Sequence, residues 1–196
     1  MIGAILLPSM KLRDLIKMQK ANDGSRSLFE SVMVPELASV LQDWQTYVPN
    51  GVLIGGMGLS FHVKPRMTQD LDFLFLSDTE IPDQVSGFKR TRGHAFQHNK
   101  THVEIEILTP EFIKVPRPVV EQIIKSATVS DGIKIASAAG MVASKLFRLS
   151  LQDKADIVAL INSGRVSGLD EFHLPPEKMA IFKELEIVAN SEREST

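Results

Sequence analysis

The chain has 196 residues, of which 43% are hydrophobic, so it is long enough for a single domain over 1–196 with a sizeable core. Its 22 basic and 24 acidic residues leave a formal charge of −2, which excludes a protein that coats nucleic acid by bulk positive charge. The lack of cysteine excludes disulfide frameworks, thiolate zinc sites and cysteine nucleophiles. The apolar stretch Ile2–Leu7 has no basic segment before it and is too short to span a membrane, so we expect a cytoplasmic protein with no membrane partner.

The first fifty residues are expected to form helices. Ser9 is placed to cap a short helix that runs to Lys20. From Leu28 to Trp44, apolar residues recur at three- and four-residue spacing, which predicts an amphipathic helix. Pro35 either splits or kinks this pattern or begins a second helix as its first residue.

The middle of the chain changes to a strand pattern. Val52–Ile54 is a short apolar strand that runs into Gly55-Gly56, and polar and apolar residues alternate over Gln69–Leu76. The same alternation predicts a strand over 101–108, and residues 88–98 are expected to add a strand before it. These segments predict a small mixed sheet.

The last third of the chain returns to helix. Helices are predicted over Ala136–Ser150 and Asp153–Ser163, and Pro175-Pro176 opens a final helix that ends near Val188. The order of helices, strands and helices predicts one α/β (α+β) domain. Its expected parts are N-terminal helices over 1–50, a core sheet over 51–130, a C-terminal helical part over 131–189 and a frayed tail over 190–196.

The acidic residues of two predicted strands are placed to share one face of the sheet. Asp70 and Asp72 lie two residues apart, so their side chains point to the same side with Cα atoms about 7 Å apart. Glu104 and Glu106 have the same spacing on the later strand, and all four carboxylates converge if the two strands pair. Such carboxylates can hold hard divalent cations, and the glycines of Gly55-Gly56 let backbone N–H groups approach a phosphate. The alternative is a tight turn followed by a solvated strand face.

Two blocks of the sequence resemble the nucleotidyltransferase fold. The first is Leu53–Leu59 followed by Arg66–Phe73, a hydrophobic strand with Gly-Gly and then an Asp-x-Asp pair. The second is Lys145–Arg148 followed by Gln152–Ile157, which is similar to a helical segment of the family with a Lys-Leu pair and two acids. The branch that it resembles contains the abortive-infection type nucleotidyltransferase toxins and their uncharacterised bacterial relatives.

The resemblance implies that Asp70, Asp72 and Glu106 are catalytic and hold Mg²⁺ or Mn²⁺, with Glu106 standing where the family usually has Asp. Independently of the resemblance, Lys145 and Arg148 lie three residues apart on one helix face, which suits them to a triphosphate or to an ordinary salt-bridged helix surface. The residues expected to contact the nucleotide are Gly55, Gly56, Thr68, Lys145, Arg148, Asp153 and Asp156.

A nucleotidyltransferase of this kind is expected to move a nucleoside monophosphate from an NTP to an RNA, protein or small-molecule acceptor. The resemblance also implies a toxin–antitoxin or phage-defence setting with a cognate partner protein. The alternative is a non-catalytic binding or regulatory module of the same fold. A third interpretation is a purely structural domain, which predicts that Asp70 and Asp72 point in different directions.

Residues 84–103 form a predicted hairpin that contains basic residues and no acid. Such a hairpin either meets the phosphates of an RNA acceptor or protects an exposed edge strand from pairing. The hairpin's cationic and imidazole side chains are Lys89, Arg90, Arg92, Lys100, His94, His98 and His102. The four-residue spacing of the histidines would make a zinc-binding face on a helix, but the strand alternation favours a hairpin that separates them.

Overall fold

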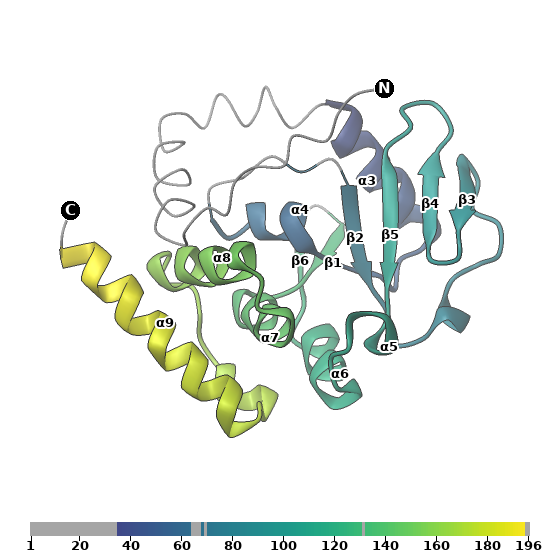
Figure 1. Cartoon of the computed structure of the whole chain (residues 1–196). Coiled ribbons are helices and arrows are strands. Elements are labelled where there is room, and N and C mark those ends of the chain that lie inside the picture. The colour runs from purple at the N-terminus through teal and green to yellow at the C-terminus, as the bar shows by residue number, and fades with distance from the viewer. Residues whose placement is uncertain (1–34, 64–67, 69, 131, 195–196) are drawn as a thin grey trace, which may run out of the picture.

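A mixed sheet of seven strands runs through the part of the chain that the computed structural model describes, residues 35–63, 68, 70–130 and 132–194 (Figure 1). The two central contacts are an antiparallel pair of β1 with β2 and a parallel pair of β2 with β5. The fold is therefore of the α+β class, as the sequence predicts. In order across the sheet, the strands are β3 (Phe88–Arg92), β4 (Ala95–His98), β5 (Glu104–Leu108), β2 (Asp70–Leu74), β1 (Val52–Ile54), β7 (Ile133–Ile135) and β6 (Thr128–Ser130).

Helices precede, interrupt and follow the strands. The longer ones are α3 (Pro35–Tyr47), α6 (Arg117–Lys125), α7 (Ala138–Arg148), α8 (Leu151–Asn162) and α9 (Pro176–Glu194). The short ones are α4 (Gly55–Ser60), α5 (Pro110–Ile113) and the 3-10 turns η1 (Asp78–Glu80) and η2 (Leu169–Phe172). None of the described helices is both long enough and apolar enough to cross a membrane.

Helix α3 covers one face of the sheet through a fully buried tryptophan. The Trp44 ring lies 5.9 Å from the ring of Phe73 and 5.1 Å from each of the rings of Phe88 and Phe96, centroid to centroid. Phe73 is an odd-numbered residue of β2, so the even-numbered Asp70 and Asp72 point to the opposite face. The apolar period in α3 and the alternation in β2 thus fix which face of the sheet is covered and which carries the acids.

Helix α4 begins directly after β1, and it packs against β2 and α7. A Cβ atom at Gly58 would lie 2.9 Å from the backbone oxygen of Leu53 and would collide with the Met141 side chain of α7. An alanine is therefore too large for this position unless the backbone near Leu53 and the Met141 side chain move.

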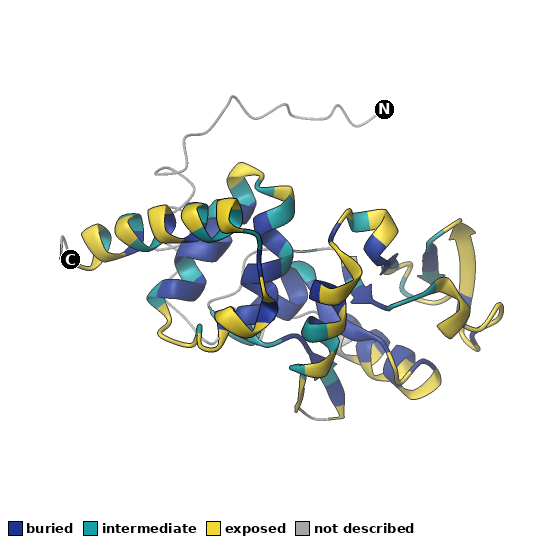
Figure 2. Cartoon of the chain, turned by 90° about the horizontal axis from the view of Figure 1, so that it is seen from below, coloured by how far each residue is buried: buried dark blue, intermediate teal, exposed yellow. Residues whose placement is uncertain are grey.

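The C-terminal helices form a second layer, and Figure 2 shows that α9 leaves one side exposed along its length. Its buried side consists of Phe182, Leu185 and Ala189. Lys178 of α9 also lies over the Phe147 ring of α7, 5.3 Å from the centroid, and this contact joins the two helices.

Two predicted boundaries are wrong. The sheet does not end at residue 130, because the hairpin of β6 and β7 adds two more strands and β7 pairs with β1 at Leu53 and Ile135. The final helix does not end near Val188, and residues 190–194 are not frayed. Arg193 donates hydrogen bonds to Asn162 Oδ1 at 2.9 Å and to the Ile161 carbonyl at 2.6 Å, which holds the last turn against α8.

The remaining predictions agree with the described elements in part. Pro35 is the first residue of α3, and α7 and α8 lie within two residues of their predicted bounds. The single strand predicted over 88–98 is divided at Gly93-His94 into the antiparallel strands β3 and β4, and β4 pairs with β5. The helix predicted from Ser9 to Lys20 and the apolar positions from Leu28 to Met33 lie outside the described residues. Helices α5 and α6 lie in the segment that is predicted as sheet, although the buried Val119, Val120 and Ile123 of α6 follow a helical spacing.

Candidate functional site

The strand register brings the predicted acids together on the face of the sheet opposite α3. β2 lies between β1 and β5, and Asp72 is directly opposite Glu106 on β5. Asp70 is opposite Glu104 in the same parallel ladder. Residues directly opposite each other point to the same face, so all four carboxylates share that face. Asp70 and Asp72 therefore point to the same face of the sheet and not in different directions.

Gly55 lies against the Asp72 carboxylate. The two residues are close because Ile54, the last residue of β1, is opposite Asp72 in the antiparallel ladder. Gly55 has φ +65°, a conformation that favours glycine, and a Cβ atom built on it would overlap Asp72 Oδ2. Glycine is therefore required here for two reasons, the backbone conformation and the space that the carboxylate fills.

The acids crowd one another enough to change how Asp72 binds a proton. Burial, then the negative charges of Asp70 and Glu106, raise the pKa of Asp72 from 3.8 to about 7, against the opposing charge of Lys145. A side-chain hydrogen bond with Glu106 also favours the protonated form. Carboxylates that lie close together and are partly buried, with a raised pKa, are typical of functional sites.

Thr68 lies beside the acids and positions one of them. Its Oγ1 donates a hydrogen bond to Asp70 Oδ1 at 2.7 Å. The predicted role of Thr68 was contact with the nucleotide; the described contact is with the Asp70 carboxylate. Asp70 is exposed, so this hydrogen bond holds a side chain that packing alone would leave free.

The second sequence block forms a buried ion-pair network between α7 and α8. Lys145 Nζ lies 3.2 Å from Asp153 Oδ1 and 2.7 Å from Asp156 Oδ2, and the side-chain exposure is 5% for Lys145 and 0% for both aspartates. Arg148 donates two hydrogen bonds of 2.7 Å to the two oxygens of Asp153. This bidentate geometry is among the strongest that charged side chains make.

Two further residues, which are not among the predicted site residues, also bind the network. Ser150 Oγ donates to Asp153 Oδ2 at 2.7 Å, and Gln152 Nε2 donates to Asp156 Oδ1 at 2.8 Å. Ser150 and Asp153 form a capping box at the start of α8, and their three-residue spacing is the signal that would have revealed it.

The network determines the protonation of Asp153. Burial by itself would raise the pKa of this carboxyl, but the hydrogen bonds from Arg148 and the charge of Lys145 outweigh burial and hold the pKa well below its usual range. In the opposite direction, the hydrogen bond with Asp153 raises the pKa of Arg148 against the effect of burial, and the charge of Asp72 adds to the rise. The charge of Arg148 is therefore coupled electrostatically both to Asp153 and to Asp72.

The buried aspartates differ from their predicted role. Asp153 and Asp156 are buried, and their carboxylates are bound by side chains of α7, of the Ser150 cap and of α8, so in this arrangement they position cations and do not face a nucleotide. Arg148 is different, because its side chain is 67% exposed even while it is paired.

The donor set fits a hard divalent cation, although the described side chains are not arranged around one. Among the described residues, no group of three or more His, Cys, Asp or Glu side chains is in a position to hold a metal ion. Asp70 is turned toward Thr68, and Asp72 shares a hydrogen bond with Glu106. A cation would relieve the repulsion that raises the pKa of Asp72, and carboxylate oxygens are the ligands that Mg²⁺ and Mn²⁺ accept.

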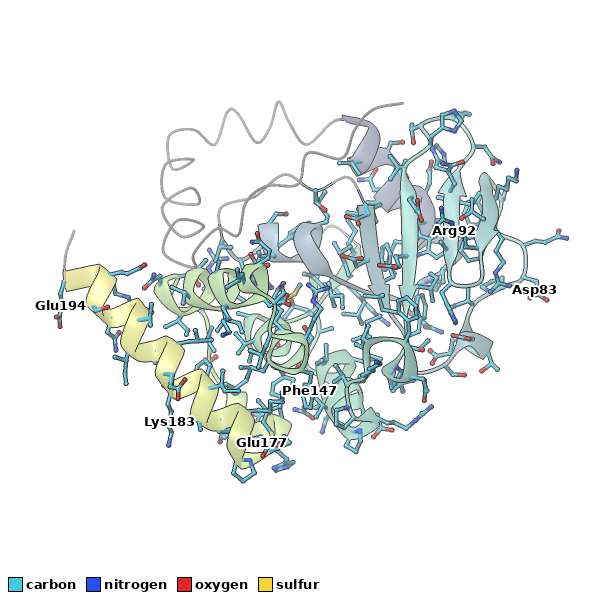
Figure 3. All side chains as sticks on the ribbon, in the orientation of Figure 1. Asp83, Arg92, Phe147, Glu177, Lys183 and Glu194 are labelled. Atoms are coloured by element: carbon cyan, nitrogen blue, oxygen red, sulfur yellow. The ribbon has the colours of Figure 1, made fainter. Side chains whose placement is uncertain are left out.

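The histidines of the β3–β4 hairpin are separated, as the strand alternation predicts. His98 is buried and contacts Thr101 Oγ1 at 2.9 Å, whereas His94 lies 3.5 Å from Asp78 Oδ1. Lys89 and Arg92 are exposed on β3, which is an edge strand, and Figure 3 shows Arg92 on the opposite side of the molecule from Glu194.

Comparison with known proteins leaves the function to the residues of the site. No family model matches the chain, and no curated protein matches it. Among solved structures, the crystal structure of JHP933 from Helicobacter pylori is similar with a TM-score of 0.35 and 14% sequence identity, over 87% of this chain and 97% of that chain. A likeness at this level carries no information about substrate or activity.

Proposed function

We propose that this protein is a metal-dependent nucleotidyltransferase that transfers a nucleoside monophosphate from an NTP to an acceptor hydroxyl or phosphate. The observation that supports the proposal is the pairing of β2 with β5, which sets Asp72 beside Glu106 and next to Gly55. Carboxylates on adjacent strands can hold the metal ions of a two-metal phosphoryl-transfer site, and the glycine beside them leaves room for a phosphate to approach the backbone.

In this proposal Asp70, Asp72 and Glu106 hold Mg²⁺ or Mn²⁺. The bound metal would supply polarisation of the attacking oxygen and neutralisation of charge on the leaving pyrophosphate. To hold a cation, the Asp70 and Asp72 carboxylates would have to give up their hydrogen bonds with Thr68 and Glu106. A carboxylate oxygen of this group accepts the proton that the acceptor hydroxyl loses as its oxygen bonds to the α-phosphorus.

The remaining residues bind and orient the triphosphate. Gly55 and Gly56 present backbone N–H groups to the β- and γ-phosphates. The exposed Arg148 binds a phosphate oxygen with its Nη1, which makes no hydrogen bond to the described residues, while Asp153 fixes the other side of the guanidinium. Lys145 acts through its charge, because it is enclosed by Asp153 and Asp156.

The proposed acceptor is an RNA, a protein or a small molecule in the cytoplasm. A toxin–antitoxin or phage-defence role with a cognate partner protein is the setting that the sequence resemblance implies. The acceptor is identified by incubating the protein with each α-³²P-labelled NTP, Mg²⁺ or Mn²⁺, and separate pools of RNA, protein and metabolites.

The deciding test compares Asp72→Asn with the unaltered chain in this label-transfer assay. We expect loss of label by at least about 10²-fold, because removal of a metal-binding or transition-state-stabilising group commonly costs this much. Glu121→Gln, which removes an exposed acid on α6 away from the site, is the matched control and keeps the activity. Equal label in Asp72→Asn and in the unaltered chain would overturn the proposal.

A non-catalytic module is the second candidate, and one observation favours it. Lys145 and Arg148 already have carboxylate partners, so an incoming triphosphate does not find two free cations. This candidate predicts no label transfer from any NTP and no heat of NTP–Mg²⁺ binding in calorimetry, together with a stable complex with the product of a neighbouring gene. NTP–Mg²⁺ binding that Asp72→Asn abolishes rejects it.

A further inference from the structure

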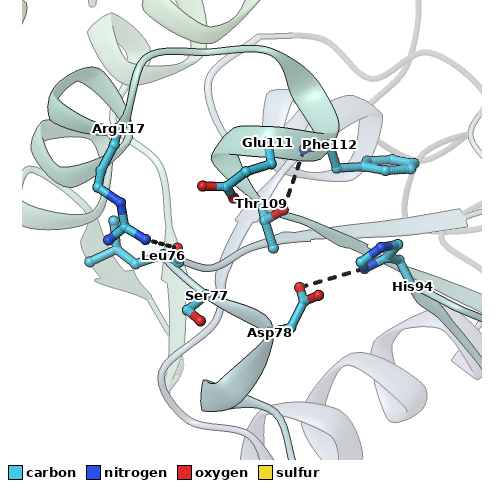
Figure 4. Close-up of a pocket in the computed structure, with 8 residues that line it drawn as sticks. All are labelled: Leu76, Ser77, Asp78, His94, Thr109, Glu111, Phe112 and Arg117. Atoms are coloured by element: carbon cyan, nitrogen blue, oxygen red, sulfur yellow. Dashed lines mark hydrogen bonds and ion pairs between the residues drawn. The ribbon is translucent and has the colours of Figure 1, made fainter.

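A second site lies at the carboxyl ends of β2 and β5, away from the acids. It is an open pocket of about 490 Å³ between the segment that follows β2, the turn that holds His94, helix α5 and the start of α6 (Figure 4). Adjacent parallel strands leave a crevice at their carboxyl ends, and ligands commonly bind there. Leu76 lines the pocket and follows Asp72 by four residues, which is roughly 13 Å of extended chain. The pocket is therefore distinct from the site of Asp72 and Glu106.

One wall of the pocket presents a guanidinium that is held in place and mostly unused. Arg117 Nη2 donates to the carbonyl of Leu76 at 3.0 Å, which fixes the guanidinium over the end of β2. An arginine has five N–H donors, and no other partner for Arg117 is found among the described residues. The free donors suit a carboxylate, which accepts two parallel hydrogen bonds from this group.

The other polar groups of the pocket carry the opposite charge. Glu111 is exposed and makes no ion pair with the described residues, and Asp78 is linked only to the His94 ring, 3.5 Å away. Figure 4 shows the Glu111 and Asp78 carboxylates on either side of Thr109. The pocket therefore offers separate sites for a negative and a positive group of one ligand.

An aromatic surface completes the pocket. Phe112 keeps 47% of its area exposed, and its ring lies 5.3 Å from the His94 ring, centroid to centroid. A large apolar ring exposed at the edge of a polar pocket is the usual anchor for a flat group of a ligand.

We propose that this pocket binds a free α-amino acid with an aromatic side chain. The α-carboxylate pairs with Arg117, the α-ammonium with Glu111 or Asp78, and the side chain packs on Phe112 and His94. The charge of the pocket disfavours a nucleotide. Arg117, Glu111 and Asp78 give the pocket a net charge of −1, with His94 counted as neutral. A phosphate would add about two more negative charges. A zwitterion adds no net charge.

The test uses the whole chain without nucleotide, so its outcome does not depend on the proposed transferase activity. Each protein amino acid is added at millimolar concentration to ¹⁵N-labelled protein, and amide shifts are followed by NMR. We expect phenylalanine, tyrosine or tryptophan to bind with a Kd between about 10 μM and 1 mM. The shifts should be confined to residues 76–78, 94 and 109–117.

Ligand analogues test the two charged contacts without altering the protein. Phenylalaninamide lacks the carboxylate and 3-phenylpropionate lacks the ammonium, and each should bind at least about tenfold more weakly than phenylalanine. Arg117→Lys keeps the charge but loses the planar fork, so it should weaken binding about tenfold, whereas Arg92→Lys on the edge strand should not change it.

Four outcomes overturn the proposal. They are no binding by any amino acid, equal affinity for the analogue that lacks one charged end, shifts centred on Asp70 and Asp72, or tighter binding of AMP than of phenylalanine at the pocket residues. The unfolding temperature of each variant is measured in parallel. If Arg117→Lys is unstable, the analogue series alone decides.

Discussion

Asp72 and Asp153 are both withdrawn from water by this fold, yet their pKa values move in opposite directions. Burial works in the same direction on each, since it favours the neutral carboxyl. Asp72 has Asp70 and Glu106 as neighbours, and its pKa rises to about 7. Asp153 has Arg148, Lys145 and the Ser150 hydroxyl as partners, and its pKa falls below the usual range.

The two aspartates therefore have different roles. Asp153 belongs to a network that stabilises the fold, whereas Asp72 belongs to a cluster of carboxylates that repel one another. The ion pairs around Asp153 join α7 to α8, and every charge in them has a partner. The acids on β2 and β5 repel one another, and the fold keeps them together because their strands pair in this register. Repulsion that packing outweighs is typical of a binding or catalytic site.

The largest expected effect comes from breaking the network at its most connected member. Asp153→Ala leaves Lys145 and Arg148 without their shared partner and removes the Asp153 half of the α8 capping box, so we expect the free energy of unfolding to fall by about 3–5 kcal/mol. Urea denaturation measures it. Asp83→Ala is the matched control: Asp83 is 98% exposed and lies 3.5 Å from Arg90, and an exposed pair contributes about 0–1 kcal/mol. Similar losses in the two variants would contradict the role of the network.

The next effect concerns the contact of Gly55 with Asp72. Gly55→Ala adds a left-handed strain of about 1–2 kcal/mol and a collision with the carboxylate worth about 1–3 kcal/mol more. Gly164→Ala is the control, because Gly164 has φ +68° and nothing lies within 4 Å of its added Cβ. The difference between the two variants in chemical denaturation isolates the collision. If the two lose equal stability, the carboxylate does not fill the space beside Gly55.

A smaller effect of opposite sign is expected at Asp72. Between pH 4 and pH 7 the folded chain keeps a proton on Asp72 that the unfolded chain releases, since the pKa is 3.8 unfolded and about 7 folded. Stability therefore falls as the pH rises through this window and stays lower above it. Asp72→Asn removes that loss, and we expect it to be more stable than the unaltered chain by about 1–3 kcal/mol at pH 8, with little difference at pH 4.

The pH profile also distinguishes the two aspartates. Asp153 has a lowered pKa, so the stability that it contributes is present above about pH 4 and is lost as the pH falls below that value. Thermal unfolding from pH 3 to pH 8 should show the Asp72 effect near neutrality and the Asp153 effect only in acid. Glu104→Gln, on the same face as Asp72, controls for the loss of one negative charge. A pH-independent gain in Asp72→Asn would mean that burial and neighbouring charges do not act on this carboxyl.

The smallest effect tests whether a cation relieves the repulsion. Mg²⁺ or Mn²⁺ at ten times its Kd should raise the free energy of unfolding by about 1.4 kcal/mol. The rise should disappear in Asp72→Asn and in Glu106→Gln and persist in Glu121→Gln. Stabilisation of the same size in all four proteins would mean that the metal binds elsewhere.

Local sequence patterns were sufficient for much of the fold and part of the site. The alternation of Asp70, Leu71, Asp72 and Phe73 already places two carboxylates on one face and an aromatic ring on the other, because the strand period is two. The spacing of Leu37, Val40, Leu41 and Trp44 predicts α3, and Trp44 packs on the predicted face. The boundary near Val188 could not be predicted, since it depends on Arg193 reaching α8.

The sequence by itself therefore determined which residues alternate, that α3 and α9 begin at prolines and which acids share a strand face, because these properties arise within a few residues of chain. The tertiary structure decided which strand became the neighbour of β2, that Gly55 contacts Asp72, and that Lys145 and Arg148 pair with Asp153. Strand pairing and the choice of a buried charge partner depend on residues far apart in sequence, so local periodicity does not contain them. The near balance of 22 basic and 24 acidic residues thus includes one group of acids that repel one another and one network in which acids and bases are paired.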